Sequence, residues 1–238
     1  AYEIPLRLVR SEMCIRDRQK LDVTANNLAN INNYGYKNKS VSFSNLMYYN
    51  MNNQYGQDTA MKAGTGVKVE MTNTDFTPEA YTETDGAYDF AIGGKGFFRL
   101  VNPSSDAVTY TRNGHFSLSQ QGNQFYLVND AGNRVCDRNG NPVIVNNGTF
   151  SGEIGIYQFN ITDGMQSVGD NEFAPTAKNG TPFLVQDGKL IRHALETSGV
   201  DMAEEMTKVI ESQRAYSYAL RMVQTSDEIV NTVNSLRQ

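Results

Sequence analysis

Apolar residues recur at helical spacing in residues 198–238. They are Met202, Met206, Val209, Tyr216, Leu220, Val223, Val230 and Val233. Gly and Pro are absent after Gly199, so the pattern predicts one long amphipathic helix. Asp201 stands where an N-cap is expected, and Glu204 places negative charge near the positive end of the helix dipole.

Polar residues interrupt this apolar stripe at heptad spacing. Gln213, Asp227 and Asn234 are the interrupting residues. Coiled-coil seams use such residues to fix register, whereas a fully buried helix rarely tolerates them unpaired. Amphipathicity does not tell whether the partner belongs to the same chain, so a helix lying on its own domain is an equal alternative.

A shorter helical pattern covers residues 19–33, with Leu21, Ala25 and Leu28 on one face and Gly35 where a left-handed cap is needed. The same stretch is crowded with asparagine: Asn26, Asn27, Asn30, Asn32 and Asn33. Asparagine is a mediocre helix former, so helix propensity does not explain these residues. Their amides either hydrogen-bond across packed helices or are solvated at a frayed helix end, and the residues alone favour the second interpretation.

The first residues, 1–18, read AYEIPLRLVRSEMCIRDR. Pro5, several arginines and the lack of a clean period predict a poor start for a helix, so we expect the helix to begin near residue 19.

Short strand patterns alternate with turn signals between residues 87 and 183. The expected strands are 89–92, 97–101, 108–112, 115–118, 125–128, 142–145 and 154–159. Asn113-Gly114 is the strongest hairpin signal, and Gly122-Asn123 marks another turn. No strand–helix–strand spacing occurs, so the sheet should be antiparallel. Residues 38–86 have little apolar period, and their composition slightly favours a flexible linker over an extended segment that packs against a partner.

Candidate chemistry is weak throughout the chain. The glycine-rich residues 93–96 include Lys95 but lack the following helix of a phosphate loop, so a tight turn is expected. Asp137 begins a spacing like that of a calcium loop, but Pro142 replaces the required glycine. His115 and His193 have no ligand at metal or triad spacing. We therefore expect no catalytic, cofactor-binding or metal site, and no enzyme.

Charge and composition exclude further classes. The 238 residues carry a net charge of −5, and the mean hydropathy is −0.50 with a pI near 5.1. These values argue against a general nucleic-acid binder, and no stretch is apolar enough for membrane insertion. No cleavable secretory signal is visible. The two cysteines, Cys14 and Cys136, form no disulfide framework or metal motif and are expected to be free thiols.

Two separated motifs resemble one known family. LDVTANNLANINNYGYK at residues 21–37 resembles the N-terminal signature of the bacterial flagellar rod and hook proteins. SGVDMAEEMTKVIESQRAYSYALRMVQTSDEIV at residues 198–230 resembles the C-terminal pattern of the same family. AYDFAIGGKGFFRL, YTRNGHFSL and ITDGMQSVGDNEF resemble the outer domain of this family. The two terminal motifs stand in the right order at the right ends, which makes the resemblance specific, and it is closest to the distal-rod type.

The resemblance implies an α+β fold in which long terminal helices pair as a coiled coil around a central antiparallel all-β domain. It implies a structural subunit of the flagellar basal body that forms a helical homo-polymer, contacts other axial proteins and is exported by the flagellar type III apparatus. It also makes the apolar stripe and the amides an assembly interface. The expected interface residues are Leu21, Asn26, Asn27, Leu28, Asn30, Gly35, Tyr36, Met206, Val209, Gln213, Tyr216, Leu220 and Val223.

The implied plan has six parts. They are residues 1–18, the axial helix and signature 19–37, the arm 38–86, the outer domain 87–183, a return segment 184–197 and the axial helix 198–238. The family's first helix normally begins earlier, with small and apolar residues. We therefore hypothesise that residues 1–18 are a foreign segment from cloning or sequence assembly.

The alternatives within the family are a proximal-rod protein or, less well matched because the central region is short, a hook protein. An alternative from another class is a secreted β-domain that binds carbohydrate or protein and dimerises through its C-terminal helix. A defined dimer in sedimentation would favour that alternative.

Overall fold

The computed structural model describes residues 3–46, 48–52, 58–64, 67–146, 148–186 and 188–236. The chain forms two compact units. The helical unit comprises Ala1–Ala29, Lys39–Asn73 and Asp201–Gln238, and the β unit comprises Asn30–Asn38 and Thr74–Val200.

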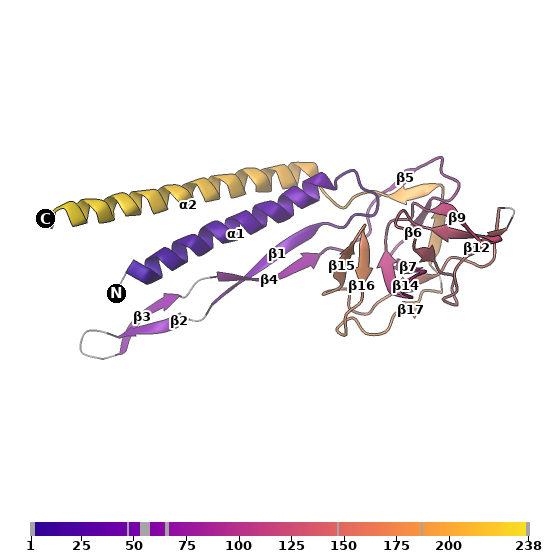
Figure 1. Ribbon diagram of the computed structural model, residues 1–238, viewed down its shortest axis with the longest axis horizontal. Helices are drawn as coiled ribbons and strands as arrows, with labels where there is room; N and C mark the ends of the chain where they lie inside the picture. Colours follow the sequence, from indigo (N-terminus) through magenta and orange to yellow (C-terminus); the bar gives the residue numbers. More distant parts are fainter. Residues whose placement is uncertain are drawn as a thin grey trace. The chain divides into compact units, whose positions relative to one another are not determined.

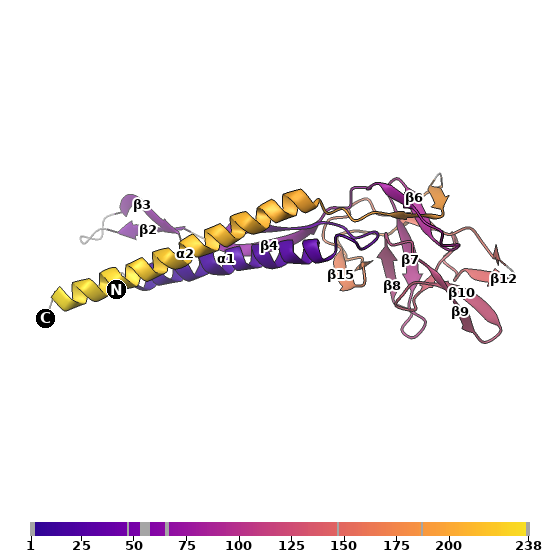
Figure 2. The ribbon, with the colours of Figure 1, turned by 90° about the horizontal axis from the view of Figure 1, so that it is seen from above.

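Two antiparallel helices dominate the helical unit. Helix α1 (Glu3–Ala29) and helix α2 (Met202–Leu236) lie side by side in both ribbon views (Figures 1 and 2). Strand β1 (Lys39–Asn45) pairs with β4 (Val67–Thr74), and β2 (Tyr48–Asn52) pairs with β3 (Asp58–Gly64). The predicted C-terminal helix is therefore confirmed, and the arm folds into two strand pairs.

The N-terminus of α2 has the predicted cap. The Asp201 carboxylate Oδ1 accepts hydrogen bonds from the backbone N–H groups of Ala203 at 2.8 Å and Glu204 at 3.3 Å. A side-chain oxygen in this position satisfies N–H groups that have no partner within the helix, which stabilises a helix by about 1 kcal/mol.

Helix α1 differs from the prediction at both ends. It begins at Glu3 and not near residue 19, so the expected poor helix start over residues 1–18 is wrong. Pro5 lies in the first turn, where its missing N–H has no intrahelical acceptor in any case. The helix ends at Ala29, and Gly35, with φ of 65°, follows in the left-handed conformation beyond the turn.

The β unit is built from short strands. They are β5 (Tyr81–Glu83), β6 (Phe90–Gly93), β7 (Phe97–Val101), β8 (Val108–Thr111), β9 (Ser117–Gln121), β10 (Gln124–Val128), β11 (Arg134–Val135), β12 (Ile144–Asn146), β13 (Thr149–Phe150), β14 (Ile156–Gln158), β15 (Gln166–Gly169), β16 (Glu172–Ala174), β17 (Phe183–Leu184), β18 (Lys189–Arg192) and β19 (Ala194–Glu196).

Eleven of these strands form one sheet in the order β13-β12-β10-β11-β7-β8-β16-β15, to which β14, β17 and β9 add side pairings. Strands β18 and β6 form a separate two-stranded sheet, and β19 and β5 form another. The neighbours pair antiparallel, as in β7 with β8 and β10 with β9. The α+β class with a β-rich central region is therefore confirmed.

Two clusters of buried side chains form the core of the β unit. The first includes Phe90, Phe98, Leu100 and Leu127, each no more than 1% exposed. The second is aromatic and centres on Tyr110, whose ring meets that of Phe159 edge to face at 4.9 Å between centroids.

The predicted Asn113-Gly114 hairpin is wrong. Strand β8 pairs with β7 and β16, and β9 pairs with β10. Gly114 is required for another reason, because a Cβ there would lie 1.6 Å from the backbone oxygen of Phe90. The tight hairpin is at Gly122-Asn123, where Gln121 pairs with Gln124 and Gly122 has φ of 65°.

Cys136 is a free thiol with no exposed surface, and burial raises its pKa to about 11. A thiol with that pKa is only about 1% ionised at pH 9, and the thiolate is the reactive form. We expect iodoacetamide to leave Cys136 unmodified in the folded chain and to alkylate it in urea. Peptide mass spectrometry of a Cys14→Ser variant measures this, and rapid labelling under native conditions would contradict the burial.

Candidate functional site

Asn27 joins three elements of the helical unit. Its side chain is buried, and its Nδ2 donates to the carbonyl of Lys39 in β1 at 2.8 Å and to Glu205 Oε2 in α2 at 3.2 Å. Its Oδ1 accepts the Lys39 N–H at 3.1 Å. Asn27 therefore hydrogen-bonds through both its amide oxygen and its amide nitrogen, and these bonds link α1 to β1 and α2. They explain why asparagine occupies this position despite its poor helix propensity.

Glu205 completes this polar cluster. Its side chain is 1% exposed, and its Oε1 accepts a hydrogen bond from Lys208 Nζ at 2.8 Å. Lys208 also forms an ion pair with Glu204 at 2.8 Å. The buried carboxylate thus has a cation and an amide as partners, so its desolvation is compensated.

The face of α2 that is buried differs from the predicted stripe. The buried residues are Glu205, Ser212 and Ala219, spaced seven apart. Five members of the predicted stripe are largely exposed, with 58% for Val233, 57% for Met202, 48% for Met206, 40% for Leu220 and 37% for Tyr216. The seam inside the chain is therefore small and polar, and much of the apolar stripe remains uncovered.

The other predicted interface residues fall in three groups. Leu21, Leu28, Val209 and Val223 are half-buried within the helical unit, and Asn26 and Gln213 are exposed. Asn30 is half-buried in the β unit, where its backbone carbonyl accepts a hydrogen bond from Ser198 Oγ at 3.1 Å. Gly35 and Tyr36 are buried inside the β unit. Their role in assembly stays a prediction.

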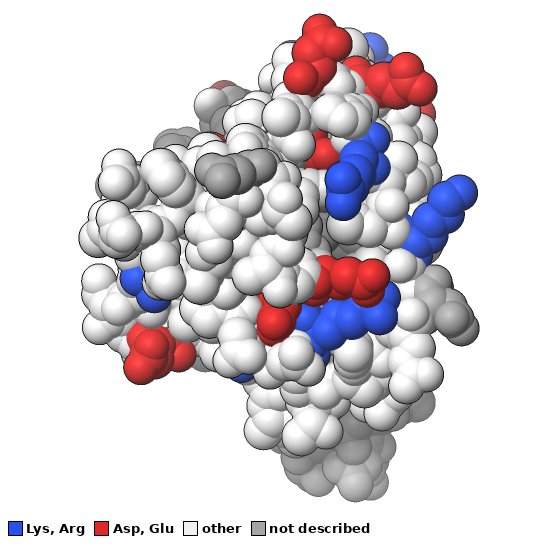
Figure 3. Space-filling model, turned by 90° about the vertical axis from the view of Figure 1, so that its right-hand side faces the viewer, with Lys and Arg blue, Asp and Glu red and all other residues white. Residues whose placement is uncertain are grey.

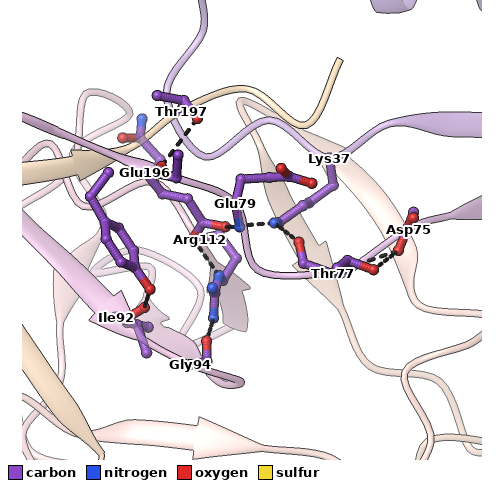
Figure 4. Close-up of polar contacts among 12 residues, drawn as sticks. Lys37, Asp75, Thr77, Glu79, Ile92, Gly94, Arg112, Glu196 and Thr197 are labelled. Carbon is purple, nitrogen blue, oxygen red and sulfur yellow. Dashed lines mark hydrogen bonds and ion pairs between the residues drawn. The ribbon is translucent and has the colours of Figure 1, made fainter. Parts of the chain in front are cut away.

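A buried ion cluster lies where the signature enters the β unit (Figure 4). Glu196 Oε1 accepts from Lys37 Nζ at 2.6 Å, and Glu196 Oε2 accepts from Arg112 Nε at 2.7 Å. All three side chains are no more than 2% exposed. The backbone N–H of Glu79 donates to Glu196 Oε1 at 3.0 Å. One carboxylate therefore holds two cations from sequence positions far from its own.

Backbone carbonyls bind further donors of the cluster, while Arg112 Nη2 is buried without a hydrogen-bond partner among the described residues. Lys37 Nζ donates to the carbonyl of Thr77 at 2.5 Å, and Arg112 Nη1 donates to those of Gly94 at 2.8 Å and Gly96 at 2.7 Å. Burial lowers the pKa of Lys37 from its ordinary value, while the hydrogen bond and negative charge of Glu196 oppose that shift. The charges of Lys37 and Arg112 are thus compensated mainly by the Glu196 carboxylate and not by solvent.

The same region brings three backbone segments together: residues 30–38, 74–80 and 194–200, here called the junction segments. Gly35 N–H donates to the carbonyl of Glu196 at 2.8 Å, and Gly199 N–H donates to that of Tyr36 at 2.9 Å. Thr197 N–H donates to the carbonyl of Ala80 at 2.9 Å. The signature residues Gly35, Tyr36 and Lys37 are therefore fixed within the chain's own fold.

Comparison with known proteins gives a consistent assignment. Three family profiles match: "Flagella basal body rod protein" over residues 15–37, "Flagellar hook protein FlgE/F/G D1 domain" over 91–169, and "Flagellar basal body rod FlgEFG protein C-terminal" over 191–236. The flagellar basal-body rod protein FlgG of Buchnera aphidicola from Schizaphis graminum is 31% identical, covering 91% of this chain and 93% of the relative. This chain belongs to the flagellar rod and hook protein family.

Two further relatives are also flagellar basal-body rod proteins. FlgG of Caulobacter vibrioides is 29% identical over 98% of both chains, and FlgF of the same organism is 31% identical over 89% of both. The rod protein described here is therefore a structural subunit of the flagellar basal body and not an enzyme, as its sequence predicts.

The Gly93–Gly96 region of this rod protein is a structural turn. It connects β6 to β7, and the carbonyls of Gly94 and Gly96 point to Arg112. A phosphate loop instead presents N–H groups to its ligand. The tight-turn interpretation is confirmed.

Lys95 at this turn is exposed. We expect Lys95→Ala to change the free energy of unfolding of the rod protein by less than about 0.5 kcal/mol, because surface changes away from specific partners are nearly neutral. Urea denaturation of the two chains measures this. Swimming of cells that carry the variant should also be unchanged, and complete loss of motility would reopen a role for the lysine in binding.

The carboxylate of Asp137, which begins the spacing like that of a calcium loop, accepts hydrogen bonds from the chain's own backbone. Asp137 Oδ1 accepts hydrogen bonds from the backbone N–H groups of Asn139 at 2.8 Å and Asn141 at 2.9 Å.

His115 Nδ1 contacts Asp89 Oδ1 at 2.9 Å, and this carboxylate is 26 positions away in the sequence. The residues that the structure describes contain no group of three or more His, Cys, Asp or Glu side chains placed to hold a metal ion.

The surface of the rod protein carries no large patch of one charge on the face that Figure 3 shows. Acidic and basic side chains there lie in small mixed groups on a mostly uncharged surface. Within the described part of the chain, no helix is both long and apolar enough to cross a membrane.

Sequence reasoning missed the residues at the centre of both polar clusters. The sequence patterns indicate no buried polar role for Glu196, Arg112 or Glu205. Lys37 and Glu196 are 159 positions apart in the sequence, and Asn27 and Glu205 are 178 positions apart. The sequence signal for the two polar clusters is limited to Lys37 and Asn27, because each is a polar residue inside the N-terminal signature.

Proposed function

We propose that this rod protein polymerises helically through α2, builds the distal part of the rod and transmits torque along it. The observation that carries the proposal is that α2 leaves two apolar faces uncovered. The first face is the exposed part of the predicted stripe, with Met202 at 57% exposure, Met206 at 48% and Leu220 at 40%.

The second face lies nearly opposite the first. Its members are Tyr218, Met222, Ile229, Val233 and Leu236, which are between 58% and 82% exposed. Placing Val233 on the predicted stripe is wrong, because 13 helical positions put it about 220° around the helix from Leu220. Tyr218 and Met222 are each two positions from Leu220, and two helical positions turn the chain by about 200°. Met222, Ile229 and Leu236 stand seven residues apart, the spacing of a coiled-coil seam.

Two opposite apolar faces favour an open polymer over a dimer. A dimer would cover one face of α2 and leave the other in water, whereas a head-to-tail association covers both and does not close on itself. The antiparallel packing of α1 and α2 supports a coiled-coil pair as the axial element of each subunit, with residues 19–37 and 198–238 forming it. Residues 87–183 would form the outer domain, with 38–86 as the arm and 184–197 as the return segment.

The partners we propose are further copies of this chain, other axial proteins of the flagellum and the type III export apparatus of the flagellum. The match to FlgG relatives supports the distal position. The similarity to FlgF of Caulobacter vibrioides keeps a second position in the rod as the alternative.

Sedimentation velocity over a range of protein concentrations tests the polymer. We expect a monomer at low concentration and a broad distribution of larger species as concentration rises. A single dimer that does not grow would overturn the proposal.

Deletion of the gene, followed by electron microscopy of purified basal bodies, tests the place in the axis. An axis that stops short of the hook supports a rod subunit, and the point of arrest separates the distal from the proximal position. Complete, working flagella without a substituting gene copy would contradict the assignment.

The hypothesis of a foreign segment over residues 1–18 stays a proposal, and the matching family profile, which begins at residue 15, speaks against its last four residues. Asp17 Oδ2 and Ser212 Oγ are buried and have no hydrogen-bond partner among the described residues. Both line a cavity between α1, β1 and α2, so this contact leaves two buried polar atoms unpaired. Mass spectrometry of the N-terminal peptide from native cells decides the matter, and recovery of AYEIPLR would refute the hypothesis.

A further inference from the structure

The β unit contains a polar cavity of about 570 Å³ that the assembly does not explain. Its walls come from four places in the chain: residues 30–34 of the signature, 111–115 after β8, the turn at 129–131 and the β15–β16 turn at 170–171. Each of the four segments contributes an asparagine to the wall. The volume lies within the range of pockets that bind small organic ligands.

Several of these amides are held in place and still have hydrogen-bonding capacity. Asn171 Nδ2 donates to the carbonyl of Tyr34 at 3.3 Å, and Asn33 Nδ2 donates to Asn30 Oδ1 at 2.6 Å. Asn113 Oδ1 accepts the N–H of His115 at 3.0 Å. These bonds leave further amide positions on Asn33, Asn113 and Asn171, because each primary amide has two donors and two acceptor lone pairs.

The chemistry of the lining excludes several ligand classes. It contains no lysine or arginine, and its two carboxylates, Asp130 and Asp170, disfavour an anion. Among the described residues no three His, Cys, Asp or Glu side chains are placed to hold a metal ion, so the two carboxylates do not indicate a metal site. Ala131 and Tyr34 are the only lining residues with mainly apolar side chains, so most of the lining residues offer polar groups to a ligand.

A neutral ligand rich in hydroxyl groups satisfies every one of these conditions. Each hydroxyl is at once a donor and an acceptor, as each amide is, and so it can bond to either end of an asparagine. Tyr34 is 40% exposed and offers a ring on which the C–H face of a sugar can lie. We infer that this cavity is a binding site for a neutral oligosaccharide, an inference that does not depend on how the subunits polymerise.

The test uses the full chain and two probes, a trisaccharide of N-acetylglucosamine and maltotriose. Saturation-transfer NMR detects binding, and a titration gives the dissociation constant. Open, polar sites compete with water, so we expect a dissociation constant on the order of 1 mM for at least one probe. Absence of saturable binding for both probes would overturn the inference.

Matched variants at Tyr34 locate the binding. Tyr34→Ala should weaken binding by about tenfold or more, whereas Tyr34→Phe keeps the ring and should retain it within about threefold. Thermal melts of each variant verify that the β unit is folded. Equal binding by both variants would place the sugar elsewhere and refute the site. An effect of Tyr34→Ala on sedimentation alone, without sugar binding by the parent chain, would identify a protein contact instead.

Discussion

Replacing Glu196 with glutamine is expected to destabilise the β unit by about 3–5 kcal/mol, the usual cost of removing one partner from a buried ion cluster. The melting temperature should fall by roughly 10 °C. One amide cannot serve both Lys37 and Arg112, because its oxygen accepts from one cation and its NH₂ group then faces the other. Two buried cations would be left without a counter-charge.

Calorimetry and urea denaturation measure this effect, and Glu153→Gln is the matched control. Glu153 also pairs with an arginine, Arg138 at 2.9 Å, but its side chain is 74% exposed. An exposed pair contributes at most about 1 kcal/mol. Equal losses for the two variants would show that burial of the Glu196 cluster has no special role.

The Glu196→Gln variant should also acquire a new pH dependence. Burial already lowers the pKa of Lys37, and Glu196 is what opposes this shift. Without the carboxylate, the folded chain favours neutral Lys37, while the unfolded chain keeps the ordinary value of 10.5. The deficit in stability should therefore shrink as the pH rises from neutral toward that value, because the folded state then loses its proton first.

Leu220→Asp is expected to abolish polymerisation while the β unit stays folded. The substitution places a charge on the first apolar face of α2, and a charge buried in a subunit contact without a partner opposes association by several kcal/mol. In this chain Leu220 is already 40% exposed, so the isolated subunit has little packing to lose. Sedimentation velocity should show only the monomer at concentrations where the parent chain polymerises.

Thr232→Asp is the control for charge, since it adds the same charge at an exposed position of α2 that lies about 120° around the helix from Leu220, between the two apolar faces. It should sediment like the parent chain. The melting of the β unit should be unchanged in both variants. Polymers formed by Leu220→Asp would show that this face is not in the contact, and the second face would then be tested with Met222→Asp.

Local patterns along the chain predicted much of the fold. The period of the C-terminal residues gave α2 and its cap at Asp201, and β7 has the predicted bounds of 97–101. These elements are specified by neighbours in sequence, either through apolar period or through a side chain that bonds to a nearby backbone group. The same patterns failed for residues 3–18, because packing beside α2 can stabilise a helix whose own period is poor.

The polar clusters could not be predicted because their members are distant in sequence. Asn27 is recognisable as an unusual helix residue, but nothing near it in the chain indicates Glu205 as its partner. Gly114 shows the opposite error. Its neighbour Asn113 suggests a turn, whereas the glycine is required by the close approach of the Phe90 backbone. Which of two uses a glycine serves is decided by tertiary contacts.

The junction segments have a mechanical consequence. The chain passes between its two units at four places, after residues 29, 38, 73 and 200. On the β-unit side, the backbone next to these crossings is cross-linked by hydrogen bonds, among them Asp75 N–H to the carbonyl of Asn38 at 2.9 Å and Gly199 N–H to that of Tyr36 at 2.9 Å. A pull on any one connection is therefore shared with the others, and these bonds must break together before one strand can peel away. Such load sharing suits the proposed transmission of torque, because a force that reaches the β unit through one connection is spread over the others.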